Sequence, residues 1–125
     1  MEFRENQAIY LQIADHLSDN ILLGKLKPLD RIPSVREMAV NIEVNPNTVM
    51  RTYNFLQDKG IIFNKRGIGY FIAEDGLKKT IALRKEHFVD QELPRLFKEM
   101  QLLGMTIEDL KTYQKSFDSG NPQTL

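Results

Sequence analysis

A regular spacing of apolar residues near the start of the chain predicts an amphipathic helix over about residues 7–23. The repeating positions lie four residues apart, which places them on one helical face, and Leu22 and Leu23 widen that face. Gly24 follows directly, and a glycine just past the last turn commonly ends a helix in a left-handed conformation. The repeating positions are Ile9, Ile13, Leu17 and Ile21.

Two shorter helical patterns follow a loop, 25–33, that contains two prolines and cannot continue the first helix. Ser34 and Glu37 have the spacing of a capping box, which predicts the start of the second helix. Asn45 can cap the third helix, with Pro46 at its first position, where a missing N–H costs nothing. The residues expected to face the core are Val35, Met38, Ala39 and Ile42 in the second helix and Val49, Tyr53 and Leu56 in the third.

A hairpin is predicted directly after these helices. Two short β-prone runs, 61–63 and 70–72, flank the glycine-containing loop 64–69, which is typical of a β-hairpin. Two helices joined by a tight turn and followed by such a hairpin predict a winged helix–turn–helix domain over residues 1–75. The expected fold class is therefore mainly α with a small β-hairpin wing.

The chain after the wing is expected to form a short two-helix dimerisation segment, 76–118, followed by a disordered polar terminus, 119–125. Apolar residues there are spaced alternately four and three apart, as at a seam between helices. Pro94 lies inside this pattern and is expected to kink or interrupt the helix. A small preceding domain can cover only part of the seam, so we expect a homodimer; an internal core and a small-molecule pocket are the alternatives. The seam positions are Val89, Leu93, Leu96, Met100 and Leu103.

The composition excludes several classes of protein. Apolar residues make up 42% of the 125 positions, yet no apolar stretch reaches the ~20 residues that a membrane-spanning helix needs. The chain has no cysteine, so a disulfide framework and thiolate metal sites are excluded. Residues 1–6 are charged and lack the apolar core of a signal peptide. We therefore expect a cytoplasmic protein with no membrane partner.

The formal net charge is zero, but the basic residues are concentrated in the predicted winged helix. Between Gly24 and Tyr70 there are eight basic and four acidic residues, which gives that segment an excess of positive charge. A local basic face on a neutral protein favours a nucleic-acid partner that is held by both phosphate attraction and base contacts.

Several polar and basic residues, among them the helix cap Asn45, and two glycines of the wing are candidates for contacting double-stranded DNA. The recognition helix of a helix–turn–helix, which is the third predicted helix of this chain, places its N-terminal residues in the major groove. There asparagine pairs with adenine and arginine with guanine. A cation at the start of the preceding helix and a basic wing tip suit phosphate or minor-groove contacts. The alternative for each residue is a structural or solvated role, such as helix capping by Asn45. The candidates are Arg36, Asn45, Asn47, Thr48, Arg51, Lys65, Arg66, Gly67 and Gly69.

The residues give little support for an enzyme. His16 and His87 lie on separate predicted helices and have no cysteine or paired carboxylates at metal-ligand spacing. The sequence contains neither a phosphate-binding loop nor a nucleophile elbow. We expect no catalytic residue, no metal and no cofactor.

The chain resembles the GntR family of bacterial transcription regulators over about residues 8–73. The similarity rests, in chain order, on the segments 9–13, 29–39, 44–49 and 66–71. It implies that Arg36 contacts DNA from the second helix, that the candidates of the third helix read the operator, and that Arg66, Gly67 and Gly69 form the wing.

The short segment after the wing is similar to that of the YtrA subfamily, whose members dimerise through those helices and often control transporter operons. The resemblance implies a homodimer on a pseudo-palindromic operator, without a dedicated effector-binding domain, and we expect a repressor that occludes a promoter. Two alternatives stay open. The first is a winged-helix protein-interaction module that does not bind DNA; the second is a regulator with a small-molecule effector site near Phe88, Leu96 and Phe97.

Overall fold

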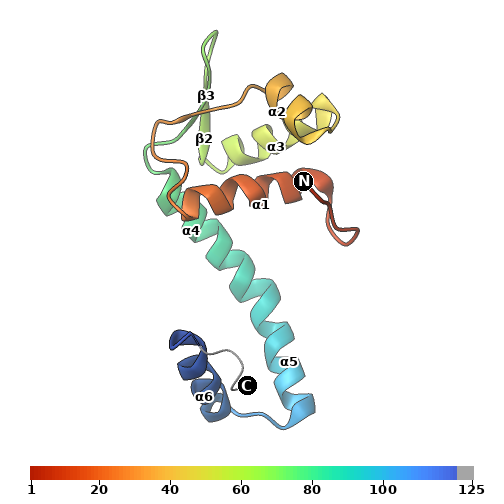
Figure 1. Ribbon diagram of the computed structural model, residues 1–125, viewed down its shortest axis with the longest axis vertical. Coiled ribbons are helices and arrows are strands. Elements are labelled where there is room, and N and C mark those ends of the chain that lie inside the picture. Colours follow the sequence, from red (N-terminus) through yellow and green to blue (C-terminus); the bar gives the residue numbers. More distant parts are fainter. Residues whose placement is uncertain (121–125) are drawn as a thin grey trace. The chain divides into compact units, whose positions relative to one another are not determined.

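The computed structural model describes residues 1–120, which form two compact units: Met1–Lys85 and a second unit that begins at Glu86. The first unit combines helices with a small antiparallel sheet, and this confirms the expected fold class (Figure 1). Its elements in chain order are α1 (Ile9–Leu22), β1 (Arg31–Ile32), α2 (Val35–Ile42), α3 (Pro46–Asp58), β2 (Ile62–Lys65), β3 (Gly69–Ile72) and α4, which begins at Gly76 and ends at His87.

The core of this unit lies between α1, α3 and the sheet. The predicted face of α3 is fully buried, and three of the four repeating positions of α1 are buried with it. The expectation was wrong at the ends of α1, because Ile9 is 44% exposed and Leu23 is 68% exposed. Since α1 ends at Leu22, residues beyond that point no longer follow the helical face. The main core residues are Ile13, Leu17, Ile21, Ile32, Val49, Tyr53, Leu56, Ile61 and Ile72.

Two buried hydroxyl groups fix how α3 is rotated against its neighbours. Thr52 Oγ1 donates to the carbonyl oxygen of Tyr10 in the first turn of α1, at 2.8 Å. Tyr53 Oη donates to the carbonyl oxygen of Pro33, at 2.6 Å, and burial raises the pKa of its phenol. The Thr52 hydroxyl also reaches the Thr48 carbonyl oxygen of its own helix, at 3.2 Å, whereas Tyr53 Oη depends on Pro33. An unpaired buried hydroxyl costs about 1–3 kcal/mol, so the Tyr53 bond penalises rotation of α3 about its axis.

The predicted helix ends are confirmed at residue level. Ser34 Oγ accepts from the Glu37 N–H at 3.1 Å, and the Glu37 carboxylate accepts from the Ser34 N–H at 3.0 Å. These hydrogen bonds from Ser34 lower the pKa of Glu37. Asn45 caps α3 with Pro46 in the first turn, and Gly24 adopts a left-handed φ of 78° after α1.

The sheet contains a strand that the sequence did not predict. Residues 25–33 were expected to be a loop, but β1 within them pairs with β3, and the sheet order is β1-β3-β2. The hairpin loop is also shorter than the expected 64–69, because β2 reaches Lys65 and β3 begins at Gly69, and these two residues pair directly. The pairing leaves only residues 66–68 at the tip.

The helix α4 begins as part of the first unit. Gly76 and Thr80 are buried, and the Arg84 guanidinium donates to Asp19 of α1 at 2.8 Å. Gly76 fits closely against the sheet: a Cβ there would lie 2.9 Å from Ile72 Cγ2 and 3.0 Å from the carbonyl oxygen of Ile61. The first compact unit therefore extends to Lys85, past the domain boundary expected at residue 75.

The second unit is helical. After α4, a π-helical turn, η1 (Phe88–Glu92), leads into α5 (Leu93–Leu103), and α6 (Ile107–Asp118) follows. Pro94 was expected to kink or interrupt the helix, and the wider π turn lies immediately before it. A proline removes one helical N–H and crowds the preceding turn, so a local widening accommodates the ring.

The ends of these helices also follow local signals. Gly104 ends α5 with a φ of 68°, and Thr106 and Asp109 form a capping box at the start of α6. Ser119 and Gly120 form a turn that closes α6, while the rest of the expected disordered terminus, 121–125, lies outside the described residues. Within residues 1–120, no helix is long and apolar enough to cross a membrane.

We expect Gly76→Ala to lower the free energy of unfolding by about 1–3 kcal/mol, because the added methyl group meets backbone as well as side chain. An alanine in a helix ordinarily stabilises relative to glycine by about 1 kcal/mol, so the sign of the effect is diagnostic. Urea unfolding measures it, with the exposed Lys78→Ala as the control in the same turn. Equal or greater stability of Gly76→Ala would contradict the close packing.

Candidate nucleic-acid interface

The N-terminal turns of α3 present the predicted recognition residues. Asn45 Oδ1 accepts from the Asn47 N–H at 2.8 Å, so the Asn45 side chain is engaged as the helix cap. Asn47 and Arg51 are exposed, and Thr48 is half-buried. Because the opposite face of α3 is buried against α1 and the sheet, these side chains face away from the core, where a duplex could reach them.

Arg36 lies in the first turn of α2 and is exposed. The capping box beside it uses Ser34 and Glu37, so the Glu37 carboxylate is bound to the Ser34 backbone and does not pair with Arg36. A guanidinium next to free N-terminal N–H groups of a helix suits a phosphate oxygen.

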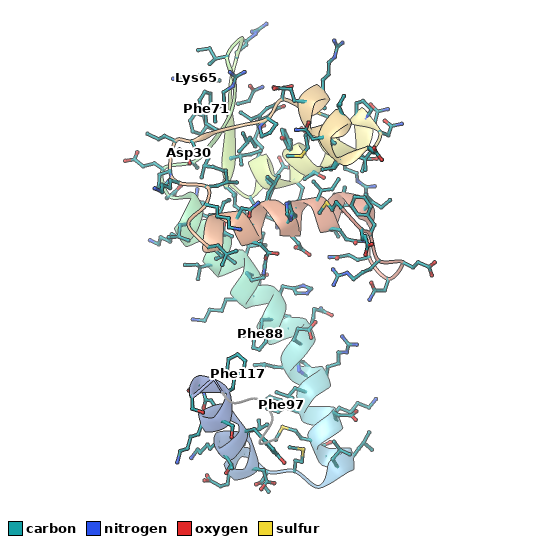
Figure 2. All side chains as sticks on the ribbon, in the orientation of Figure 1. Asp30, Lys65, Phe71, Phe88, Phe97 and Phe117 are labelled. Atoms are coloured by element: carbon teal, nitrogen blue, oxygen red, sulfur yellow. The ribbon has the colours of Figure 1, made fainter. Side chains whose placement is uncertain are left out.

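The wing tip consists of Arg66, Gly67 and Ile68. Arg66 and Gly67 are exposed there, as expected for a tip that contacts DNA. Gly67 has a φ of 79°, a conformation that residues with a Cβ rarely adopt. Lys65 and Gly69 belong to the strands, which corrects their expected place in the loop. The Lys65 ammonium lies 5.7 Å from the centre of the Phe71 ring on the neighbouring strand (Figure 2).

Gly69 makes room for another basic residue, Arg31. A Cβ at Gly69 would lie 3.0 Å from Arg31 Nε, so the glycine allows the arginine to lie against the base of the wing. Arg31 is exposed, and its strand β1 pairs with β3. The sequence indicated only that Arg31 adds to the local positive charge; its position beside the wing depends on a strand that the periodicity did not reveal.

The candidate cations are free of acidic partners. Within residues 1–120, the ion pairs connect Lys79 with Asp75, Arg84 with Asp19, Arg95 with Glu92 and Lys111 with Glu108. Arg36, Arg51, Lys65 and Arg66 are in none of them. Their charges are therefore available to phosphate groups, whose neutralisation releases counterions and supplies sequence-independent affinity.

The wing and α3 are held together by aromatic contacts. The rings of Tyr53 in α3 and Tyr70 in β3 meet edge to face with centroids 4.8 Å apart, and the Tyr70 hydroxyl lies 3.9 Å from Met50 Sδ. These contacts fix the wing relative to the recognition residues. The structure thus brings all nine candidates together in one unit, distributed over α2, the N-terminal part of α3 and the hairpin.

One contributor to this surface was missed by the sequence interpretation. Tyr10, in the first turn of α1, lies with its ring 4.0 Å from the Arg51 guanidinium carbon. The sequence places a tyrosine next to the buried face of α1, but the contact joins residues far apart in the chain. In the described part of the chain, no group of three or more His, Asp or Glu side chains could hold a metal ion.

Comparison with known proteins identifies the family of the winged helix. The sequence profile of the bacterial regulatory proteins of the GntR family matches residues 9–72, which is more than half of the chain. The chain belongs to the GntR family. The matched segment contains the whole described winged helix from α1 to β3, and the family and its structural neighbours are transcription regulators, not enzymes.

Relatives extend the likeness beyond the winged helix. The chain is 39% identical to the uncharacterized HTH-type transcriptional regulator YhcF of Bacillus subtilis, over 95% of this chain and 97% of YhcF. It is 35% identical to the HTH-type transcriptional repressor YtrA of the same organism, over 93% of this chain and 88% of YtrA. The chain is thus a DNA-binding transcription regulator of the GntR family that resembles YtrA over nearly its full length.

Solved structures show the same fold. A GntR-family structure from Bacteroides thetaiotaomicron has a TM-score of 0.77 and 46% identity, covering 90% of this chain and 97% of that chain. The DNA-binding domain of AraR in complex with an operator has a TM-score of 0.52 and 25% identity, covering 58% of this chain and 93% of that chain.

We expect the cap of α3 to depend on the side-chain oxygen at position 45. Asn45→Ala removes the acceptor of the Asn47 N–H and should lower the free energy of unfolding by about 1 kcal/mol, whereas Asn45→Ser, which restores a capping oxygen, should stay close to wild type. Thermal unfolding of the three proteins measures this. An equal loss in Asn45→Ala and Asn45→Ser would mean that capping is not what Asn45 contributes.

Proposed function

We propose that this regulator is a homodimeric repressor that binds a pseudo-palindromic operator and occludes a promoter. The N-terminal part of α3 enters the major groove, where Asn47, Thr48 and Arg51 read base edges. Arg36 holds a phosphate beside it. The wing tip, with Arg66 and its neighbours Lys65, Gly67 and Gly69, contacts the adjacent backbone or minor groove.

The observation that carries this proposal is the set of unpaired cations on the winged helix of a neutral protein. Four candidate arginine and lysine side chains on α2, α3 and the hairpin have no acidic partner within residues 1–120. The cations supply affinity by releasing counterions, and the amide, hydroxyl and guanidinium groups of α3 supply discrimination between bases. An interaction module without DNA would not need these groups together.

The second unit supports the dimer. Within residues 1–120 its one buried side chain is Met100, whereas Val89, Leu96 and Leu103 are 48%, 39% and 63% exposed and Leu93 is half-buried. Phe88, Phe97 and Phe117 are also largely exposed (Figure 2). So much exposed apolar surface on a short helical segment is the usual mark of an interface.

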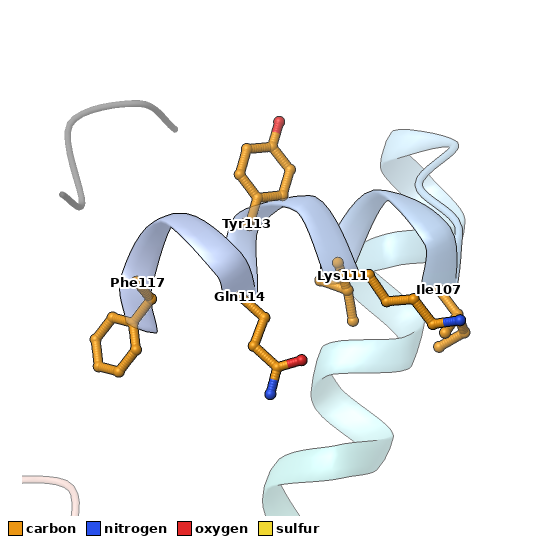
Figure 3. A pocket seen from close by; sticks show the side chains of 6 residues that line it. Ile107, Lys111, Tyr113, Gln114 and Phe117 are labelled. Carbon is orange, nitrogen blue, oxygen red and sulfur yellow. The ribbon is translucent and has the colours of Figure 1, made fainter. Parts of the chain in front are cut away.

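A shallow hollow in this unit is also lined mainly by apolar side chains. It is lined by residues of α6 alone, so within residues 1–120 it has no opposite wall (Figure 3). A small-molecule site would need walls that enclose the ligand on several sides. The hollow therefore favours a second protein surface, and none of Phe88, Leu96 and Phe97 lines it. Its lining residues are Ile107, Leu110, Lys111, Tyr113, Gln114 and Phe117.

The names of relatives support the remaining parts of the proposal. YtrA is named a repressor, and AraR is seen on an operator. A two-fold symmetric dimer matches two half-sites, which makes the operator pseudo-palindromic. Because the partner is chromosomal DNA, we place the protein in the cytoplasm. We propose residues 1–75 as the DNA-binding part and 76–118 as the dimerising part, with the start of α4 attached to the former.

We expect the protein to bind a fragment of its own promoter region in the presence of excess unrelated DNA and to protect two symmetric half-sites. Arg51→Ala should weaken binding by about 1–3 kcal/mol and relax one base position in each half-site. Arg66→Ala should weaken binding evenly across sequences. It should also lower the slope of the logarithm of affinity against the logarithm of salt concentration by about one. Footprinting and binding titrations at two salt concentrations measure these effects.

Lys115→Ala, an exposed lysine of α6, is the control and should leave binding unchanged. Binding that is equally weak for promoter and unrelated DNA would contradict the operator proposal. A loss confined to a single base position in Arg66→Ala would contradict the backbone role of the wing.

We expect a dimer that depends on the seam. Leu96→Gln combined with Leu103→Gln should place polar amides in the interface and shift the dimer toward monomer by at least about tenfold in dissociation constant. Sedimentation at several concentrations measures this, and Lys98→Gln on the same helix is the control. Because both leucines are exposed, the fold of the monomer should survive; a wild-type chain that stays monomeric at high concentration would rule the dimer out.

A further inference from the structure

Tyr10 touches the recognition helix in three ways. Its ring lies 4.0 Å from the guanidinium carbon of Arg51, its carbonyl oxygen accepts from Thr52 Oγ1 at 2.8 Å, and the edge of its ring meets Phe55 with centroids 6.2 Å apart. The rings of Tyr10 and Phe55 are inclined by 75°, an edge-to-face arrangement. One residue of α1 therefore contacts three residues of α3, at positions 51, 52 and 55.

The contact with Arg51 leaves the arginine free to bind. A cation–π contact uses the flat face of the guanidinium, while the N–H donors of an arginine lie around its edge. Stacking on Tyr10 thus restricts the rotamers of Arg51 without occupying the donors that would pair with guanine or phosphate. Within residues 1–120, Arg51 has no acidic partner that would compete for those donors.

The other cation–π contacts of the described chain do not have this arrangement. Lys59 lies 5.8 Å from the Phe55 ring at the far end of α3, and Lys65 lies 5.7 Å from Phe71 in the hairpin. Both involve a flexible ammonium at a longer distance. A planar guanidinium against an aromatic ring is the geometry in which an arginine is pre-oriented for bidentate recognition.

We propose that Tyr10 is a positioning residue for DNA recognition: it holds the Arg51 side chain in the orientation that reads the operator. The inference rests on the proposed operator-binding function and adds to it a residue outside the helix–turn–helix. The ring and the carbonyl group of Tyr10 make separate contacts: the ring supports Arg51, and the carbonyl oxygen accepts from Thr52 and holds the first turn of α1 against α3.

A double-mutant cycle tests the proposal with full-length protein and a duplex that the wild-type chain has selected from a random-sequence library. Tyr10→Leu should weaken binding about three- to tenfold and relax the base position that Arg51→Ala relaxes. In the Arg51→Ala background, Tyr10→Leu should change affinity less than about twofold. Tyr10→Phe, which keeps the ring, should bind within about twofold of wild type.

Thr52→Val is the structural comparison, because it removes the α1–α3 hydrogen bond and leaves the stack in place. Its effect on affinity should multiply with that of Arg51→Ala instead of vanishing in that background. Thermal unfolding of every variant accompanies the titrations. If Tyr10→Leu does not fold, Tyr10→Met replaces it, since methionine keeps the bulk of the side chain without the aromatic face.

Equal losses from Tyr10→Leu with and without Arg51 would overturn the positioning role and leave Tyr10 as a packing residue. An unchanged base preference in Tyr10→Leu would overturn it as well. A wild-type chain that selects no duplex would instead refute the operator-binding function itself, so the two failures are distinguishable.

Discussion

The buried face of α3 is the constraint on which the surface chemistry depends. Its apolar positions are fully excluded from solvent, and the hydroxyl groups of Thr52 and Tyr53 are bound to the carbonyl oxygens of Tyr10 and Pro33. Rotation of α3 would expose apolar surface and separate the Tyr53 hydroxyl from Pro33, and either change carries a free-energy cost. The outer residues of the helix consequently have a single direction, which recognition of bases requires.

Hydrogen bonds of nearby carboxylates help to explain how a chain of zero net charge keeps basic side chains without acidic partners. Two acidic residues of the winged helix are bound to backbone N–H groups: Glu37 accepts from the Ser34 N–H, and Asp30 accepts from the Lys27 N–H. Within residues 1–120, Arg36, Lys65 and Arg66 are in no ion pair. Capping therefore separates the two kinds of charge more effectively than composition suggests, because a carboxylate held at a helix start is a poor partner for a nearby cation.

The parts of the fold that sequence could predict are those fixed by neighbours in the chain. Capping boxes, the glycine after α1 and the apolar face of α3 depend on residues three or four apart. The strand β1 could not be predicted, because two residues become a strand only by pairing with β3, some forty positions away. Tyr10 could not be identified for the same reason, because its contacts are with residues some forty positions away. The exposed polar residues of α3 could be identified, since they are the ones that do not lie on its apolar face.

The second unit shows what happens where local signals are strong and packing is missing. The helix α6 has a capping box but no buried residue, and α5 buries only Met100 within the described chain. A helix of twelve residues, as α6 is, is marginal in water without tertiary contacts. The apolar side chains that would stabilise them are present but exposed. A second copy of the chain would supply the missing surface, so the stability of this unit and the pairing of two DNA-binding domains would depend on the same contacts.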